Sequence, residues 1–215
     1  APKAKDMMYT KKMKTPSGLA FYSDFDINEI ETTFGSLELQ KSLFFHLPRT
    51  GGSWINLALK DISVPIDPLK KVRYGHVPFY HCSNHKKFSF SFIRNPFDWY
   101  KSLYSFFTNY NMFSRPCEIN VFVQDFILKG FGLYHNTLDF FGNDYEIDFI
   151  GKYENLTSDL IKAMTLAGEV FDKETILNLS QTVVGGYPKC EDRLNDTTKD
   201  LIYKFDKKVF DTFGY

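Results

Sequence analysis

Apolar and polar positions along the chain follow patterns that predict strands and helices in alternation. The apolar run at 41–48 predicts a buried strand, and the alternation of Phe with Ser at 86–96 predicts a second one. A third strand is expected within 145–156. Apolar residues at helical spacing predict helices at 53–62, 97–110, 119–130, 156–167 and 197–214.

Residues with capping preferences mark where some of these helices begin. Ser53 is expected to cap the helix that follows the first strand. Asn95 and Pro96 supply a cap and a first-turn proline after the second strand, and Asp98 adds a negative charge that a first turn favours. Each of these two strands therefore leads through a short turn into a helix.

The alternation of strands and helices predicts an α/β fold with a central parallel sheet. In such sheets, ligands bind beyond the carboxyl ends of the strands. The turns at 48–53 and 94–96 both leave such ends, so we expect them to face one cleft. Residues 1–18 carry five lysines and are expected to form a flexible basic tail, while residues 19–215 are expected to form a single domain.

Net charge and composition make several classes of protein less probable for this sequence. The formal net charge of zero gives no support for nucleic-acid binding, and the three cysteines show neither a disulfide framework nor a zinc spacing. No apolar run reaches membrane-spanning length and no signal-peptide pattern is present, so a soluble cytoplasmic protein is expected. The Golgi lumen stays open as an alternative, because the chain begins at Ala1 and an upstream anchor could have been removed.

The turn PRTGGS at 48–53 has the features of an anion-binding nest. Gly51 and Gly52 allow backbone conformations that turn several N–H groups inward, and the following helix adds its positive end. Arg49, Thr50 and Ser53 supply side-chain donors around the same point. The alternative is an ordinary turn between a strand and a helix.

This turn does not match the Walker A loop of nucleotide hydrolases. That loop places a Lys immediately before its last Ser or Thr, and the corresponding residue here is Gly52. No convincing magnesium-binding Asp follows a later strand. A magnesium-dependent kinase or hydrolase is therefore disfavoured, and no metal site is expected.

A second anion site is predicted around Arg94 and Ser102. Arg94 lies at the end of the second strand, and Ser102 lies two turns into the helix that follows. A guanidinium presents a planar fork of donors that suits phosphate. The alternatives are a surface salt bridge for Arg94 and a solvated hydroxyl for Ser102.

Taken together, the motifs resemble those of sulfotransferases that use 3′-phosphoadenosine-5′-phosphosulfate (PAPS). HLPRTGGSW resembles their 5′-phosphosulfate loop, and RNPFDWYKSLYSFF resembles their 3′-phosphate motif. DFIGKYENLTSDL at 148–160 and the terminal DTFGY resemble the carbohydrate-type branch of the family. The resemblance covers about residues 41–215, and its specificity comes from four motifs in the right order.

The resemblance implies a three-layer α/β/α sandwich with a P-loop-like sulfotransferase fold, and PAPS as cosubstrate without a metal. It assigns Arg94 and Ser102 to the 3′-phosphate. The loop at 185–193 lies where an adenine-covering loop is expected, so Tyr187 and Lys189 become candidates for the base and a phosphate, with ordinary loop roles as the alternative. The 5′-phosphosulfate end would contact Arg49, Thr50, Gly51, Gly52, Ser53 and Trp54.

Sulfuryl transfer also needs a base for the acceptor's proton. YGHVPFY resembles the segment of carbohydrate-type members that carries this base, which assigns the role to His76. His46 is expected to pack or bond locally, and Glu154 is expected to brace the following helix rather than act as the base. Most family members have Lys where this chain has Arg49, so we expect Arg49 to act through charge and hydrogen bonds, without donating a proton.

The expected function is transfer of the sulfuryl group from PAPS to a hydroxyl acceptor, and the resemblance favours a carbohydrate over other hydroxyl compounds. Two alternatives remain: a P-loop kinase, and a module that binds PAPS without turnover. The sequence leaves the acceptor and the oligomeric state open.

Overall fold

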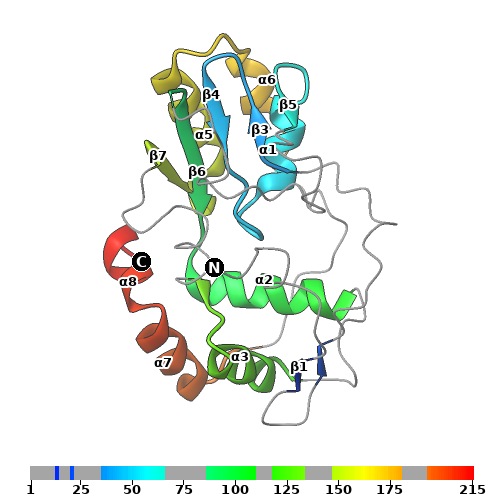
Figure 1. The fold of residues 1–215 in the computed structure, drawn as a ribbon, viewed down its shortest axis with the longest axis vertical. Helices are drawn as coiled ribbons and strands as arrows, with labels where there is room; N and C mark the ends of the chain where they lie inside the picture. Colours follow the sequence, from blue (N-terminus) through cyan, green and yellow to red (C-terminus); the bar gives the residue numbers. More distant parts are fainter. Residues whose placement is uncertain are drawn as a thin grey trace. The chain divides into compact units, whose positions relative to one another are not determined.

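The computed structural model describes residues 13–14, 20–21, 35–65, 86–109, 118–133, 147–180 and 193–215. These residues belong to two compact units that interleave along the chain (Figure 1). The sheet unit contains residues 35–65, 86–95, 133 and 147–180. The helical unit contains residues 13–14, 20–21, 96–109, 118–132 and 193–215.

The sheet unit is built on five strands, in the order β5-β3-β4-β6-β7. Strands β4, β6 and β7 pair in parallel, as the sequence pattern predicts. Strand β3 pairs antiparallel with both β4 and β5, so the sheet as a whole is mixed. The strands are β3 (Leu37–Glu38), β4 (Ser42–Phe44), β5 (Val64–Pro65), β6 (Phe88–Ile93) and β7 (Phe149–Lys152).

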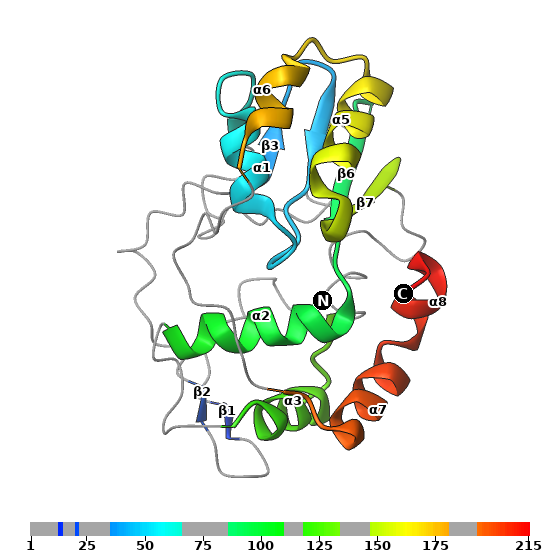
Figure 2. The ribbon, with the colours of Figure 1, turned by 180° about the vertical axis from the view of Figure 1, so that it is seen from behind.

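Three helices share a core with one face of this sheet (Figure 2). They are α1 (Gly52–Leu59), α5 (Leu156–Ala167) and α6 (Lys173–Asn178). The Phe residues of the β6 alternation lie on this face, where Phe90 and Phe92 are fully buried against Phe44. Because side chains alternate along a strand, the intervening Ser residues of β6 lie on the opposite face. The α/β class predicted from the sequence is therefore confirmed.

The hydroxyl groups of Ser89 and Ser91 on β6 are buried and form hydrogen bonds within the sheet unit. The Ser91 hydroxyl donates to the carbonyl oxygen of Phe45 at 2.6 Å, and the Ser89 hydroxyl donates to Asp148 at 2.8 Å. These bonds tie β6 to both of its neighbours near the points where the motifs begin. A buried hydroxyl costs free energy unless it is bonded in this way.

The helical unit consists of α2 (Pro96–Asn109), α3 (Ile119–Leu128), α7 (Asp196–Phe205) and α8 (Lys207–Phe213), with a short antiparallel pair of strands, β1 (Met13–Lys14) and β2 (Ala20–Phe21). Aromatic side chains form much of its interior: Trp99 and Tyr100 on α2 both pack against Phe126 on α3. Aromatic residues make up 18% of the sequence, and these contacts show that some of them are used in packing.

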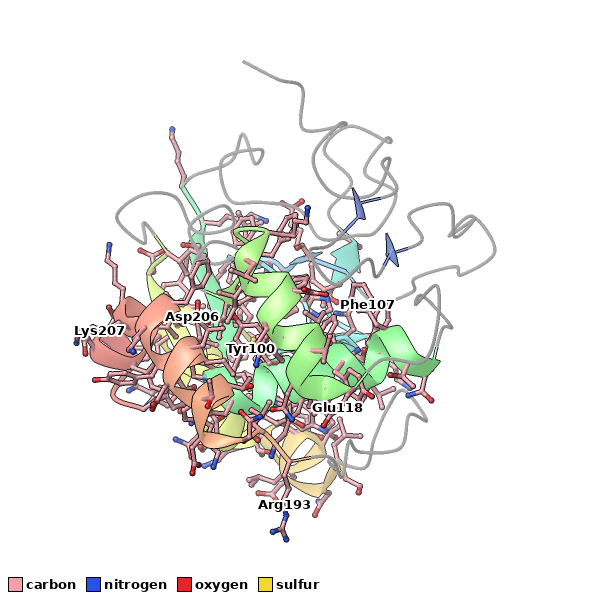
Figure 3. The ribbon with its side chains drawn as sticks, turned by 90° about the horizontal axis from the view of Figure 1, so that it is seen from below. Tyr100, Phe107, Glu118, Arg193, Asp206 and Lys207 are labelled. Carbon is pink, nitrogen blue, oxygen red and sulfur yellow. The ribbon has the colours of Figure 1, made fainter. Side chains whose placement is uncertain are left out.

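The prediction of one C-terminal helix over 197–214 is wrong, because the chain forms two helices that meet at Asp206. Asp206 is fully buried, and its carboxylate accepts a hydrogen bond of 2.8 Å from the Tyr100 hydroxyl (Figure 3). Its backbone leaves the helical region, with φ −99° and ψ 20°. The helix therefore breaks where a charged side chain must turn inward to meet its partner.

Other elements also differ from the sequence prediction. Helix α1 ends at Leu59 rather than at 62, and strand β7 is followed at once by a short 3-10 helix, η4 (Tyr153–Asn155), before α5 begins. Helix α6 was not predicted; Asp172 caps it by accepting from the N–H groups of Glu174 and Thr175. Helix α5 matches its predicted range and ends at Gly168, which has the left-handed conformation typical of a helix end, with φ 67°.

Candidate functional site

Three sequence motifs lie at the carboxyl ends of neighbouring parallel strands in the sheet unit. Ile93, the last residue of β6, pairs with Lys152, the last residue of β7. Because parallel strands keep this register, Arg94 and Tyr153 leave the sheet side by side. Strand β4, on the other side of β6, leads into the glycine turn at 48–53. The structure thus brings this turn and Arg94 to the same edge of the sheet.

The glycine turn presents backbone N–H groups at the start of α1. Gly51 has a left-handed conformation, with φ 93°, and is the N-cap of the helix. Its carbonyl oxygen accepts from the N–H groups of Trp54 and Ile55, at 3.0 and 3.1 Å. Within the described ranges, the N–H groups of Gly52 and Ser53 donate to no protein acceptor. Together with the helix dipole, such groups favour a bound anion.

Both glycines are required by close approaches of neighbouring side chains. A Cβ at Gly51 would lie 2.9 Å from Leu156 and 3.1 Å from Tyr153, in a backbone conformation that side chains rarely adopt. A Cβ at Gly52 would overlap the imidazole of His46. The turn therefore has its backbone in direct contact with side chains on two sides, which holds the N–H groups in place.

Arg49 adopts a strained backbone conformation in the same turn. Its φ is 66°, and it is the one non-glycine residue with positive φ in the described part of the chain. For an L-residue with a long side chain this conformation is unfavourable by about 1–2 kcal/mol. Strain of this kind persists at binding sites, where the surrounding structure holds it.

The hydroxyl groups of the turn have different roles. Thr50 is buried, and its hydroxyl donates to the carbonyl oxygen of Leu47 at 2.7 Å, which closes the turn. Ser53 is half-buried, and its hydroxyl makes no hydrogen bond within the described residues. The predicted cap at Ser53 is wrong, because the helix already begins at Gly52. Of the two hydroxyl groups, that of Ser53 rather than that of Thr50 is thus available to an anion.

Trp54 belongs to the core of the sheet unit. Its side chain is buried among residues of the sheet and of α5, and its indole N–H donates to the carbonyl oxygen of Ser180 at 3.2 Å. The side chain therefore fixes α1 to the sheet. The predicted contact of Trp54 with a nucleotide has no support from the orientation of this side chain.

Arg94 lies against the glycine turn and stacks on an aromatic ring. One terminal nitrogen, Nη1, donates to the carbonyl oxygen of Arg49 at a long distance of 3.4 Å. Its guanidinium carbon lies 4.1 Å from the centre of the Tyr153 ring. Its Nε is buried without a hydrogen-bond partner among the described residues, and no carboxylate there pairs with Arg94. The alternative role in a surface salt bridge is therefore not supported in this part of the chain.

The third motif, GKYENL at 151–156, supports the other two. Glu154 accepts the N–H of Asn95 at 2.8 Å, which holds the turn that follows Arg94. Leu156 is buried and lies against Gly51. Glu154 thus braces a backbone turn, in agreement with a structural role, although the turn is the one after β6 rather than the start of α5.

For four predicted site residues, the structure does not test the predicted role. Ser102 is half-buried on α2, in the helical unit, so its pairing with Arg94 stays a prediction. His76, Tyr187 and Lys189 lie outside the described residues. The roles predicted for these four residues are tested only by experiment.

Sequence reasoning did not single out Tyr153, which lies beside both Gly51 and Arg94. The sequence did contain a reason to consider Tyr153, because it lies within the segment at 148–160 that resembles the carbohydrate-type branch. His46 was expected to pack locally, and it does: it is buried, and its ring stacks on Phe44 with a separation of 5.9 Å between ring centres.

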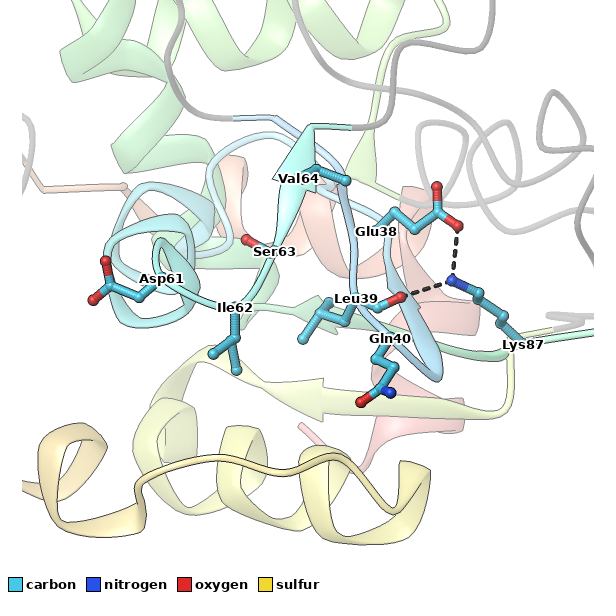
Figure 4. Close-up of a pocket in the computed structure, with 8 residues that line it drawn as sticks. All are labelled: Glu38, Leu39, Gln40, Asp61, Ile62, Ser63, Val64 and Lys87. Atoms are coloured by element: carbon cyan, nitrogen blue, oxygen red, sulfur yellow. Dashed lines mark hydrogen bonds and ion pairs between the residues drawn. The ribbon is translucent and has the colours of Figure 1, made fainter.

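A separate open hollow of about 450 Å³ lies at the other end of the strands (Figure 4). It is lined by residues 38–40, residues 61–64 and Lys87, near the amino ends of β4 and β6. Lys87 already pairs there with Glu38 at 2.7 Å and donates to the carbonyl oxygen of Leu39. This hollow is away from the three motifs and contains none of their residues.

Among the described residues, the pKa is clearly shifted at two exposed side chains outside the site. A hydrogen bond from the Thr175 hydroxyl lowers the pKa of Asp172. A hydrogen bond to Asp211 raises the pKa of Lys207. Both shifts come from local pairing on a helix and do not concern the glycine turn.

The described ranges contain neither a cluster of metal-ligating residues nor a membrane-spanning helix. No group of three or more His, Cys, Asp or Glu residues there could hold a metal ion. Of the helices that the structure describes, none combines the length and apolar character needed to cross a bilayer.

Comparisons of the chain with protein-family models, with curated proteins and with solved structures find no match. The motifs and the geometry of the carboxyl edge of the sheet are therefore the basis for assigning a function.

Proposed function

We propose that the chain is a PAPS-dependent sulfotransferase that transfers a sulfuryl group to a hydroxyl acceptor. The observation that carries the proposal is the position of Arg94, which has no carboxylate partner in the described residues and lies against a glycine turn with open N–H groups. PAPS carries phosphate groups on both the 3′ and 5′ positions of its ribose, so it needs two adjacent sites for anions. The three-layer sandwich implied by the sequence resemblance is part of this proposal.

The residues of the glycine turn would hold the 5′-phosphosulfate. The N–H groups of Gly52 and Ser53, the Ser53 hydroxyl and the Arg49 guanidinium are the donors assigned to it. Thr50 keeps the turn closed through its bond to Leu47. Donors held in fixed positions stabilise the negative charge that develops on a departing phosphate, because they need no rearrangement during the reaction.

Arg94 would bind the 3′-phosphate through its guanidinium edge, with Ser102 as the second donor. Bound PAPS supplies the sulfuryl group: the bond from sulfur to the bridging phosphate oxygen breaks, and a bond from sulfur to the acceptor oxygen forms. His76 would take the proton of the acceptor hydroxyl. Arg49 keeps its proton and contributes charge and hydrogen bonds to the leaving phosphate.

A carbohydrate is the proposed acceptor class, since two motifs resemble the carbohydrate-type branch of the family. The test is transfer of radiolabelled sulfate from PAPS to a panel of oligosaccharides and simple alcohols, with EDTA present. The proposal predicts labelled product from the wild-type chain, and loss of product in the His76→Ala variant while binding of the desulfated nucleotide persists.

Two outcomes would contradict the proposal in different ways. Phosphate transfer from ATP that requires Mg²⁺, without sulfate transfer from PAPS, would identify a kinase instead. Tight PAPS binding without transfer to any member of the panel would favour a non-catalytic binding module. Unchanged turnover in His76→Ala would exclude His76 as the base and leave the sulfotransferase activity itself intact.

A further inference from the structure

Tyr153 is placed to control the orientation of Arg94. The two residues follow paired positions at the ends of β6 and β7, so the sheet register sets them side by side. The guanidinium carbon of Arg94 lies 4.1 Å from the centre of the Tyr153 ring, within the range of a favourable cation–π contact. The ring is itself held, because Tyr153 is half-buried and packs against the core of the sheet unit.

This contact engages the face of the guanidinium. An aromatic ring interacts with the face of a guanidinium and forms no hydrogen bonds with its in-plane N–H groups. The Nε of Arg94 is buried and lacks a hydrogen-bond partner among the described residues. A carboxylate in place of Tyr153 would instead have occupied these N–H groups and neutralised the charge.

Tyr153 also connects Arg94 to the glycine turn. Its Cδ2 atom would lie 3.1 Å from a Cβ at Gly51, and Arg94 in turn donates to the Arg49 carbonyl oxygen of the same turn. One aromatic ring thus contacts both predicted anion sites. Movement of this ring would change the spacing between them.

We propose that Tyr153 is a positioning residue that orients Arg94 and thereby gives the site its preference for an adenosine nucleotide with a 3′-phosphate. This inference rests on the proposed PAPS site. It assigns the preference to the face of an aromatic ring, so the phenol hydroxyl is not required and phenylalanine should replace tyrosine.

The test measures binding of 3′-phosphoadenosine-5′-phosphate (PAP) and of AMP by calorimetry, for the wild-type chain and its variants. The two ligands differ by the 3′-phosphate alone, so the ratio of their affinities isolates the contribution of that phosphate. A variant that only damages the fold lowers the affinity for both ligands by the same factor, so the ratio stays unchanged. The inference predicts that Tyr153→Leu lowers the ratio about three- to tenfold, while Tyr153→Phe keeps it within about twofold of wild type.

A matched control is Phe149→Leu on β7, the strand that leads directly into Tyr153. Phe149 is also partly buried against the core of the sheet unit, so its loss tests packing without touching Arg94. The ratio should stay unchanged in this variant. Tyr153→Met, which fills similar volume without an aromatic face, serves if Tyr153→Leu does not fold. In an Arg94→Ala background, Tyr153→Leu should have no further effect on the ratio.

The results distinguish a failure of the role assigned to Tyr153 from a failure of the proposed PAPS site. An unchanged ratio in both Tyr153→Leu and Tyr153→Met, with the wild-type chain preferring PAP, would overturn the role of Tyr153 and leave the proposed function standing. An equal loss of affinity for both ligands would show a structural role alone, which also overturns it. A wild-type chain that binds PAP no better than AMP would contradict the 3′-phosphate site itself and, with it, this inference.

Discussion

The imidazole of His46 fills the space in which a side chain at Gly52 would lie. His46 is buried at the end of the first parallel strand, and Gly52 is the first residue of α1, so the contact joins the two sides of the glycine turn. Asn56 adds a second restraint, since its side chain donates to the Gly52 carbonyl oxygen at 2.9 Å and bonds to the backbone of Gly35. The turn is therefore packed tightly on its inner side.

Replacing Gly52 by Ala should destabilise the protein and weaken anion binding. The new methyl group overlaps His46, and forcing extra volume into a packed site costs about 1–3 kcal/mol. In a His46→Ala background the same change should cost less than about 0.5 kcal/mol, since the overlapping ring is gone. Urea unfolding of the wild type, the two single variants and the double variant measures this coupling. An equal loss of unfolding free energy from Gly52→Ala with and without His46 would contradict the assigned contact.

Replacing Arg49 by Gly should raise stability and lower nucleotide affinity together. Glycine relieves the left-handed strain, and after its larger unfolded-state entropy is counted the gain should be about 0.5–1 kcal/mol. Loss of a charged hydrogen-bonding group should weaken PAP binding about tenfold or more. Arg49→Asn is the control, because Asn tolerates the same conformation without the charge. Full affinity in both variants would show that Arg49 does not contact the ligand.

Replacing Glu154 by Gln should leave sulfuryl transfer within about twofold of wild type, because an amide oxygen can still accept the N–H of Asn95. Glu154→Ala removes this acceptor and should cost about 0.5–1 kcal/mol of stability. The measurements are the initial rate of labelled-sulfate transfer and thermal unfolding. A drop in rate of about a hundredfold in Glu154→Gln would instead identify Glu154 as the catalytic base.

The Asp172 cap of α6 should make the free energy of unfolding depend on pH in the acid range. The Thr175 hydroxyl and the N–H groups of the first turn lower the pKa of Asp172 in the folded chain. A carboxylate with a lowered folded pKa stabilises the fold above its unfolded pKa of about 3.9, and the contribution is lost as the pH falls through the folded value. Asp172→Ala should therefore be less stable than wild type near neutral pH, and the difference should shrink in strong acid. A difference that is constant across this range would contradict the linkage.

The strands and turns that carry the motifs could be predicted from local sequence because their signals are local. The Phe and Ser alternation of β6 has the period of a half-buried strand, and Gly51 marks a position that needs a left-handed backbone. Strands β3 and β5 have two residues each, which is too short for any period to appear. They form because β3 pairs with the edge of β4, and β5 in turn pairs with β3.

Features that depend on distant residues could not be predicted in this way. Apolar spacing continues through Asp206 from Ile202 to Val209, so the pattern alone favours one helix. The break depends on Tyr100, which is far away in the sequence. The position of Tyr153 beside Arg94 similarly depends on the register between β6 and β7, which no local pattern contains.

The most direct test of the proposed site is calorimetric titration of the wild-type chain with PAP, AMP and ATP, each with EDTA present. Two adjacent anion sites without a metal predict that PAP binds with one-to-one stoichiometry and more tightly than AMP by about tenfold or more. Arg94→Ala should remove this difference while leaving AMP binding unchanged. Equal affinity for PAP and AMP, or binding of ATP alone once Mg²⁺ is restored, would contradict the assignment of the site to PAPS.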